Sequence, residues 1–277
     1  MKDSLLPGWP DFIARIRART PARVLVDRAG AAYRTPTQLE LRQAHASARD
    51  AVRTELDLQR DLGPEFVERW HLFEVSTLAN SKDEYLLRPG LGRRLHESAR
   101  QQILAHCPAE TDLQVVIGDG LSVTAVAAQV PELLPRVFHA AQALHWKLGQ
   151  PFVLRHCRVG VMNDLGELLR PQVLVLLIGE RPGLATAESL SAYMGYRPKS
   201  GDHDASRNLI SNIHACGVSA DAAATRIVNL AALMMRKRMS GVNLKEQYLP
   251  PILNLAEPQQ KPHHGGYKGK TEDTEER

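Results

Sequence analysis

The chain has 277 residues, 43% of them hydrophobic and 24% charged, with a formal net charge of +4. This composition excludes general disorder, and at roughly 100 to 200 residues per domain the length allows one large or two small domains. The arginines are scattered among acidic residues, so no nucleic-acid-binding patch is indicated.

The apolar runs and the cysteines favour an intracellular protein. No apolar run approaches the roughly 20 residues of a membrane helix, and the N-terminus has no uninterrupted signal-peptide core. Cys107, Cys157 and Cys216 are far apart and odd in number, so they predict free thiols rather than a disulfide framework or a zinc site. We therefore expect a cytoplasmic location.

The first 60 residues are predicted to form a helical, only partly buried region. Residues 10–18 and 37–56 follow helical patterns, and Thr37 is suited to begin the second of them. Many charges interrupt the apolar positions of this second segment. We therefore expect residues 1–60 to be organised separately from the rest of the chain.

Residues 61–244 alternate between strand-like and helix-like segments. Strands are predicted at 72–75, within 113–122 and 151–160, at 173–178 and at 191–196. Helices are predicted from Pro89 toward Cys107, at 135–146, near 163–169, and at 219–239 with Ser219 as the N-cap. The alternation predicts an α/β fold with a parallel sheet flanked by helices.

Residues 245–277 lose this pattern. The last seventeen residues, "KPHHGGYKGKTEDTEER", hold eight charged residues and one aromatic. Because this small apolar surface cannot offset the conformational entropy lost on ordering, residues 245–277 are predicted to be a disordered charged tail.

Three polar, glycine-containing loops follow predicted strands. They are "GDGLS" (118–122), "HCRVG" (156–160) and "GERPGL" (179–184). In an open α/β sheet, ligands bind beyond the carboxyl ends of the strands, where such loops converge. Asp119 and Glu180 offer carboxylates to ligand donors. The glycines either let backbone approach a ligand or merely make tight turns, and the sequence leaves both open.

Catalytic motifs do not stand out. Ser122 lies between a strand and a helix, but "GDGLSV" does not match the G-x-S-x-G motif of serine hydrolases, and no spacing selects a base among His139, His145, His156 and His214. The third glycine of a dinucleotide motif and a P-loop are also absent. From the residues alone, the chain is an α/β ligand-binding domain without evident catalytic machinery, such as a stand-alone cofactor- or nucleotide-binding module.

Several motifs together resemble one family. They are "DEYLLRPGLGRRL" (83–95), "LQVVIGDGLS" (113–122), "LLIGERPGLATAESLSAY" (176–193), "ISNIH" (210–214) and "SGVN" (240–243). In this order they resemble the small (light) subunit of ethanolamine ammonia-lyase, from about Ala22 to Asn243.

The resemblance implies a Rossmann-like cobalamin-binding domain over residues 61–244. In that family, adenosylcobalamin lies between the small subunit and a large TIM-barrel subunit that holds the catalytic groups. Radical chemistry then converts ethanolamine to acetaldehyde and ammonia, in an assembly of several heterodimers. Many relatives have a long N-terminal extension associated with bacterial microcompartments, whereas only a short stretch precedes the similarity here. The resemblance implies no catalytic residue and no metal ligand in this chain.

The resemblance also implies contacts to the cofactor at Val159, through its backbone, and at Glu180 and Leu209. Leu209 stands where relatives have a cysteine, so its contact would also use the backbone. Arg158 is a candidate partner of the cobalamin phosphate, with a salt bridge to a neighbouring carboxylate as the alternative. The cluster of Arg88, Arg93 and Arg94 either contacts the large subunit or forms a solvated helix face.

Overall fold

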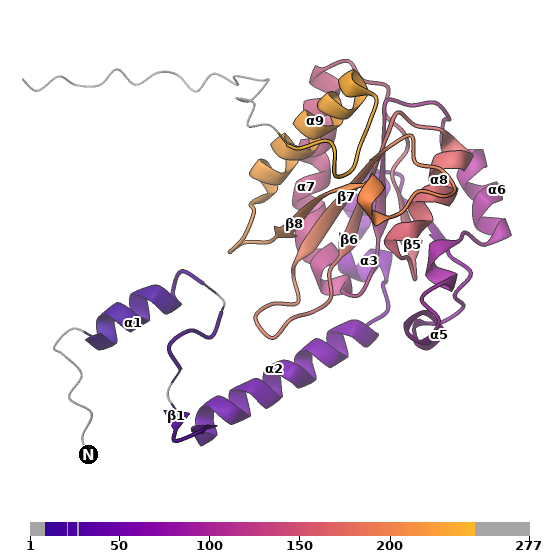
Figure 1. Ribbon diagram of the computed structural model, residues 1–277. Coiled ribbons are helices and arrows are strands. Elements are labelled where there is room, and N and C mark those ends of the chain that lie inside the picture. Colours follow the sequence, from indigo (N-terminus) through magenta and orange to yellow (C-terminus); the bar gives the residue numbers. More distant parts are fainter. Residues whose placement is uncertain (1–8, 21, 27, 247–277) are drawn as a thin grey trace, which may run out of the picture.

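A six-stranded mixed sheet forms the centre of the protein (Figure 1). The computed structural model describes residues 9–20, 22–26 and 28–246. In spatial order the strands are β3 (Glu74–Ser76), β5 (Phe152–Arg155), β4 (Leu113–Gly118), β6 (Val173–Gly179), β7 (Leu190–Tyr196) and β8 (Asn208–Ile213). The first four are parallel, whereas β7 and β8 run antiparallel to their neighbours. The α/β class is confirmed, but the prediction of a parallel sheet is wrong for β7, and β8 was not predicted.

Helices cover both faces of the sheet. The longer ones are α6 (Glu97–His106), α7 (Val123–Ala143), α8 (Met162–Leu169) and α9 (Ala220–Lys237). The short ones are α3 (Leu58–Asp61), α4 (Pro64–Arg69) and α5 (Lys82–Leu87). The helix expected from Pro89 to Cys107 is split, because a 3-10 turn at Leu91–Arg93 precedes α6. As expected, Ser219 caps α9 by accepting a hydrogen bond from the Ala222 backbone N–H.

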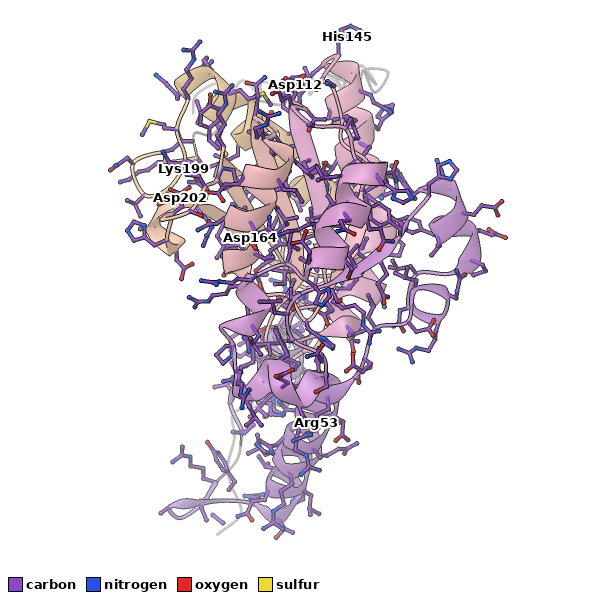
Figure 2. All side chains as sticks on the ribbon, turned by 90° about the vertical axis from the view of Figure 1, so that its right-hand side faces the viewer. Arg53, Asp112, His145, Asp164, Lys199 and Asp202 are labelled. Carbon is purple, nitrogen blue, oxygen red and sulfur yellow. The ribbon has the colours of Figure 1, made fainter. Side chains whose placement is uncertain are left out.

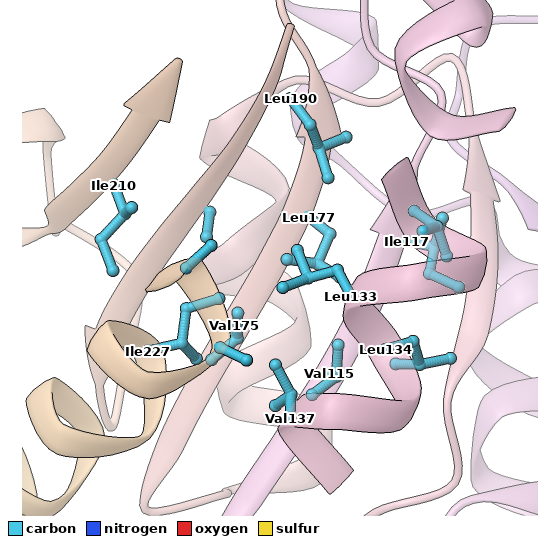
Figure 3. Close-up of a cluster of buried hydrophobic side chains, with 14 of the residues drawn as sticks. Val115, Ile117, Leu133, Leu134, Val137, Val175, Leu177, Leu190, Ile210 and Ile227 are labelled. Carbon is cyan, nitrogen blue, oxygen red and sulfur yellow. The ribbon is translucent and has the colours of Figure 1, made fainter. Parts of the chain in front are cut away.

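The core explains the apolar runs of β4 and β6. All residues of both strands are buried. Val115 and Val175 face α7, where they pack in one cluster with Leu133 (Figure 3). Val116 and Leu176 face the opposite side, in the cluster that includes α6 and α8. Because helices cover both faces, neither strand needs polar positions.

The antiparallel strands are covered differently. Alternate residues of β7, such as Ala192 and Met194, face the α7 and α9 side and are buried in its cluster. Ser191 and Tyr193 point to the other face, and Tyr193 lies opposite Leu209 of β8. An antiparallel pair can leave one face without a helix above it, and here that face forms the wall of a pocket.

The N-terminal segments extend from the body of the protein (Figure 1). They are α1 (Trp9–Arg17), the hairpin of β1 (Arg28–Ala29) and β2 (Ala32–Tyr33), and α2 (Thr35–Arg53), which contains no buried residue. Apart from Lys245 and Glu246, the predicted tail lies outside the described residues. Within the described ranges, no helix is long and apolar enough to cross a membrane.

Candidate ligand-binding pocket

A pocket of about 340 Å³ lies at the carboxyl ends of the parallel strands, against the open face of β7 and β8. Val159, Glu180 and Leu209 all line it, and so does Arg158. The remaining lining residues come from α5, the loop after β4, the end of β6 and the loop that follows it, and the last two strands: Tyr85, Gly120, Leu121, Ile178, Gly179, Arg181, Ser191, Tyr193 and Ser211. The structure therefore brings all three predicted contact positions together.

The Glu180 carboxylate is held in place by groups of this chain. Ser189 Oγ donates to its Oε2 at 2.8 Å, and Ser191 Oγ donates to Oε1 at 2.6 Å. The Asn212 backbone N–H also donates to Oε1, at 2.9 Å. Three donors from β7, β8 and the loop before β7 fix the carboxylate. A carboxylate has about four lone-pair sites, so it can still accept from a ligand.

Arg158 supplies the positive charge of the pocket. Its guanidinium lies 4.3 Å from the centroid of the Tyr85 ring, a cation–π geometry. No ion pair to Arg158 is found among the residues that the structure describes, and its buried Nε has no hydrogen-bond partner there. The alternative of a salt bridge to a neighbouring carboxylate is therefore wrong within the described residues. The guanidinium is suited to an anionic ligand group.

The other two predicted contact residues differ in character. Val159 is the first residue of a 3-10 turn, Val159–Val161, so its own backbone N–H has no partner within the turn. Leu209 is 45% exposed, so its side chain offers an apolar surface to a ligand.

Burial, with smaller contributions from the Asp204 and Glu180 carboxylates, raises the pKa of nearby Tyr193. Its phenol therefore stays protonated at neutral pH and can donate a hydrogen bond.

Asp119 does not offer its carboxylate to the pocket, contrary to the expectation from its loop. It is fully buried, and its Oδ2 lies 3.4 Å from Lys82 Nζ. The Cys157 backbone N–H donates to its Oδ1 at 3.1 Å. Asp119 thus joins α5 to the ends of β4 and β5, which is a structural role.

The glycines of these loops are explained by close packing. Gly120 has φ +56°, and a Cβ there would lie 2.4 Å from the Gly179 carbonyl oxygen. A Cβ on Gly179 would lie 2.0 Å from the Ser122 carbonyl oxygen. Such distances exclude any side chain, so tight packing accounts for both glycines, which also line the pocket.

Ser122 lacks the surroundings of a nucleophile. Its hydroxyl caps α7 by accepting from the Ala125 N–H, and it donates to the Ala187 carbonyl oxygen at 2.5 Å. His156, one of the four histidines considered as a base, is instead hydrogen-bonded to the Ala79 carbonyl and to Glu55. The geometry therefore gives no support to a serine hydrolase.

The three arginines of the predicted cluster separate. Arg93 and Arg94 line a neighbouring pocket of about 850 Å³, beside Gly160. Arg88 instead lies 3.7 Å from Glu84. All three are exposed, but Arg93 lies in the 3-10 turn and Arg94 directly follows it, so they do not form the shared helix face that was one of the two alternatives.

Sequence reasoning missed Tyr85, Tyr193 and Ser191 as pocket residues. Tyr193 and Ser191 could have been found from the alternation of small or apolar residues with polar ones in "LSAYMGY", which is typical of a strand with one open face. Tyr85 carries no comparable signal, because its place depends on how α5 packs beneath the loop after β5.

Comparison with known proteins identifies the family. The profile described as "Ethanolamine ammonia-lyase light chain (EutC)" matches residues 10–245. The chain belongs to this family. The ethanolamine ammonia-lyase small subunit of Clostridium perfringens is 40% identical over 239 residues, which cover 86% of this chain and 79% of that protein. The protein of the same name from Clostridium acetobutylicum is 37% identical over 233 residues, covering 84% and 94% respectively. The match to the light-chain profile begins at residue 10, which is earlier than the start near Ala22 that the sequence motifs indicated.

Proposed function

We propose that this chain is the small subunit of an adenosylcobalamin-dependent ethanolamine ammonia-lyase and forms one wall of its cobalamin site. The observation that carries the proposal is the meeting of Val159, Glu180 and Leu209, from three separate segments, in one pocket. Membership in the light-chain family supports a large partner subunit. That subunit would hold the catalytic groups and cover the remainder of the cofactor.

The lining of the pocket fits part of a corrinoid. A volume of about 340 Å³ is at the small end of small-molecule sites, so a second chain must enclose most of a ligand as large as cobalamin. The pocket combines a carboxylate, a guanidinium and apolar walls. These match the amide arms, the phosphate and the nucleotide tail of cobalamin. When bound, adenosylcobalamin would supply the radical chemistry of the reaction.

The residues of this chain would bind and orient. Glu180 accepts hydrogen bonds from amide or hydroxyl groups, and its three internal donors keep the carboxylate oriented before binding, so little ordering entropy remains to be lost. Arg158 neutralises the phosphate, and the Val159 backbone N–H donates to a polar oxygen. Leu209 and Ile178 exclude water from the apolar part of the ligand.

The proposal is tested by mixing this chain with a large subunit and adenosylcobalamin. We expect acetaldehyde formation only when both chains are present. Glu180→Gln should weaken adenosylcobalamin binding by about tenfold or more, because the amide removes the negative charge and puts an NH2 donor in place of one of the two acceptor oxygens. Equilibrium dialysis in the dark measures this binding independently of turnover.

Glu188→Gln is the matched control, because Glu188 lies in the same loop but is exposed and does not line the pocket. Equal affinities of the two variants would contradict the assignment of Glu180. Full activity of the large subunit without this chain would overturn the proposal. Tight cofactor binding by this chain alone would favour the stand-alone binding module.

The remaining parts of the proposed function also follow from membership in the light-chain family. The parallel part of the sheet, with helices on both faces, supports a Rossmann-like description of residues 61–244. A helical region over residues 1–60, an assembly of several heterodimers, and a cytoplasmic location with a microcompartment as one option remain predictions.

A further inference from the structure

The N-terminal arm, defined as residues 9–53, has almost no core of its own. None of the residues of α2 is buried, and Leu39 is 57% exposed. Figures 1 and 2 agree that the arm extends away from the body rather than lying on it. A helix of 19 residues spans about 28 Å, so a long helical surface is left without a partner among the residues that the structure describes.

One face of α2 has the pattern of a helix that packs against another helix. Half-buried residues recur along it at spacings of four and three, at Thr37, Leu41, Ala44, Ala48 and Ala51, and Val52 beside the last of them is half-buried as well. The positions between them are exposed, including Ala46 and Ser47. Such a stripe with small side chains allows the close approach of a second helix.

The arm also carries the positive charge of the protein. Residues 9–53 contain nine arginines against four acidic residues, whereas residues 54–246 contain 21 basic and 21 acidic residues. The balanced body of a second copy offers no net negative charge to this arm. Charge therefore favours a different partner, one that presents acidic side chains.

The arm lies at the same end of the molecule as the candidate pocket. In Figure 2, Arg53 at the base of the arm lies at the opposite end from Asp112, which directly precedes β4. The Arg23 guanidinium donates to the Leu184 carbonyl oxygen at 2.5 Å, in the loop that follows Glu180. A protein that covers the pocket would therefore also meet the arm.

From these observations we propose that the stripe of α2 is a docking surface for an acidic, helical face of the large subunit. The inference rests on the proposed function for the identity of the partner. The arm would extend the contact beyond the cofactor pocket and hold the two chains together whether or not the cofactor is bound.

The test uses two double variants of the full chain with the same charge change. Ala44→Glu with Ala48→Glu alters the stripe, and Ala46→Glu with Ser47→Glu alters the exposed face. Neither should shift the melting temperature by more than a few degrees, because no α2 residue is buried. Binding to the large subunit without cofactor is measured by titration calorimetry.

We expect the stripe variant to weaken binding about tenfold or more, and the control less than about threefold. Affinity of the wild-type chain should also fall as salt is raised. Equal effects of the two variants, or unchanged affinity of the stripe variant, would overturn the inference. Wild-type self-association that only the stripe variant abolishes would overturn it in favour of a second copy. Stripe-dependent assembly without cobalamin uptake would uphold the docking surface while contradicting the proposed function.

Discussion

The surroundings of Asp119 could be predicted only in part from the sequence. Its loop correctly predicted a turn at the end of a buried strand, but not that the carboxylate points inward. Its partner Lys82 is only 5% exposed, although nothing near it in the sequence distinguishes it from a solvated helix lysine. A charge pair across distant segments depends on packing, and local pattern cannot reveal it.

Breaking this pair should be costly. Asp119→Asn leaves the Lys82 ammonium buried without its counter-charge, while the amide can still accept the Cys157 N–H. We expect a loss of about 3 to 5 kcal/mol in the free energy of unfolding, measured by urea denaturation. Adding Lys82→Met should recover part of the loss. A change below about 1 kcal/mol for Asp119→Asn would mean that the pair is well hydrated.

At the scale of elements, strands were easier to predict than their directions. The apolar run of β6 and the alternation of β7 both indicate strands, but neither gives a direction. The connection does. Residues 180–189 form a link of ten residues without a helix, and a parallel crossover needs about a dozen or more. This signal could have predicted an antiparallel β7, and with it the open face on which the pocket lies.

The junction between α2 and the body depends on Glu55. Its carboxylate accepts from Arg155 at 2.6 Å and lies 3.0 Å from His156 Nε2. Burial acts to raise the pKa of Glu55, but the hydrogen bonds and charges of Arg155 and His156 outweigh it and hold the pKa below the ordinary value of 4.5. The ionised form is thus favoured more strongly in the folded state than in the unfolded state.

A carboxyl with a lowered folded pKa stabilises the protein above its unfolded pKa, and this stability is lost as pH falls through the folded pKa. Glu55→Gln should therefore lower the melting temperature at pH 6 to 7, and the gap to wild type should close below about pH 4.5. Thermal melts across pH measure the gap. Glu65→Gln, on an exposed position of α4, is the control. A gap that stays constant down to pH 3.5 would contradict the link.

For the whole molecule, the positions of the candidate site were predicted from the family resemblance, whereas the order of the strands explains why these positions lie together. Val159, Glu180 and Leu209 are 50 positions apart at the extremes, and only the sheet order brings their segments together. The sequence showed arginines scattered along the chain. In the fold, the arginines of residues 9–53 all belong to the N-terminal arm, which extends from the body (Figure 1). The arm is therefore positively charged, whereas the body has equal numbers of basic and acidic residues.

This separation predicts that the body folds without the arm. Removing residues 1–47 deletes most of α2 but no buried residue of that helix, and it keeps the last turn beside the body. The hydrogen bond from Arg23 to Leu184 would be lost, at a cost of about 0.5 to 1.5 kcal/mol. Urea denaturation should stay cooperative with a nearly unchanged slope, because the slope follows the surface buried in the core. A broad transition, or a loss above about 4 kcal/mol, would instead make the arm part of the folding unit.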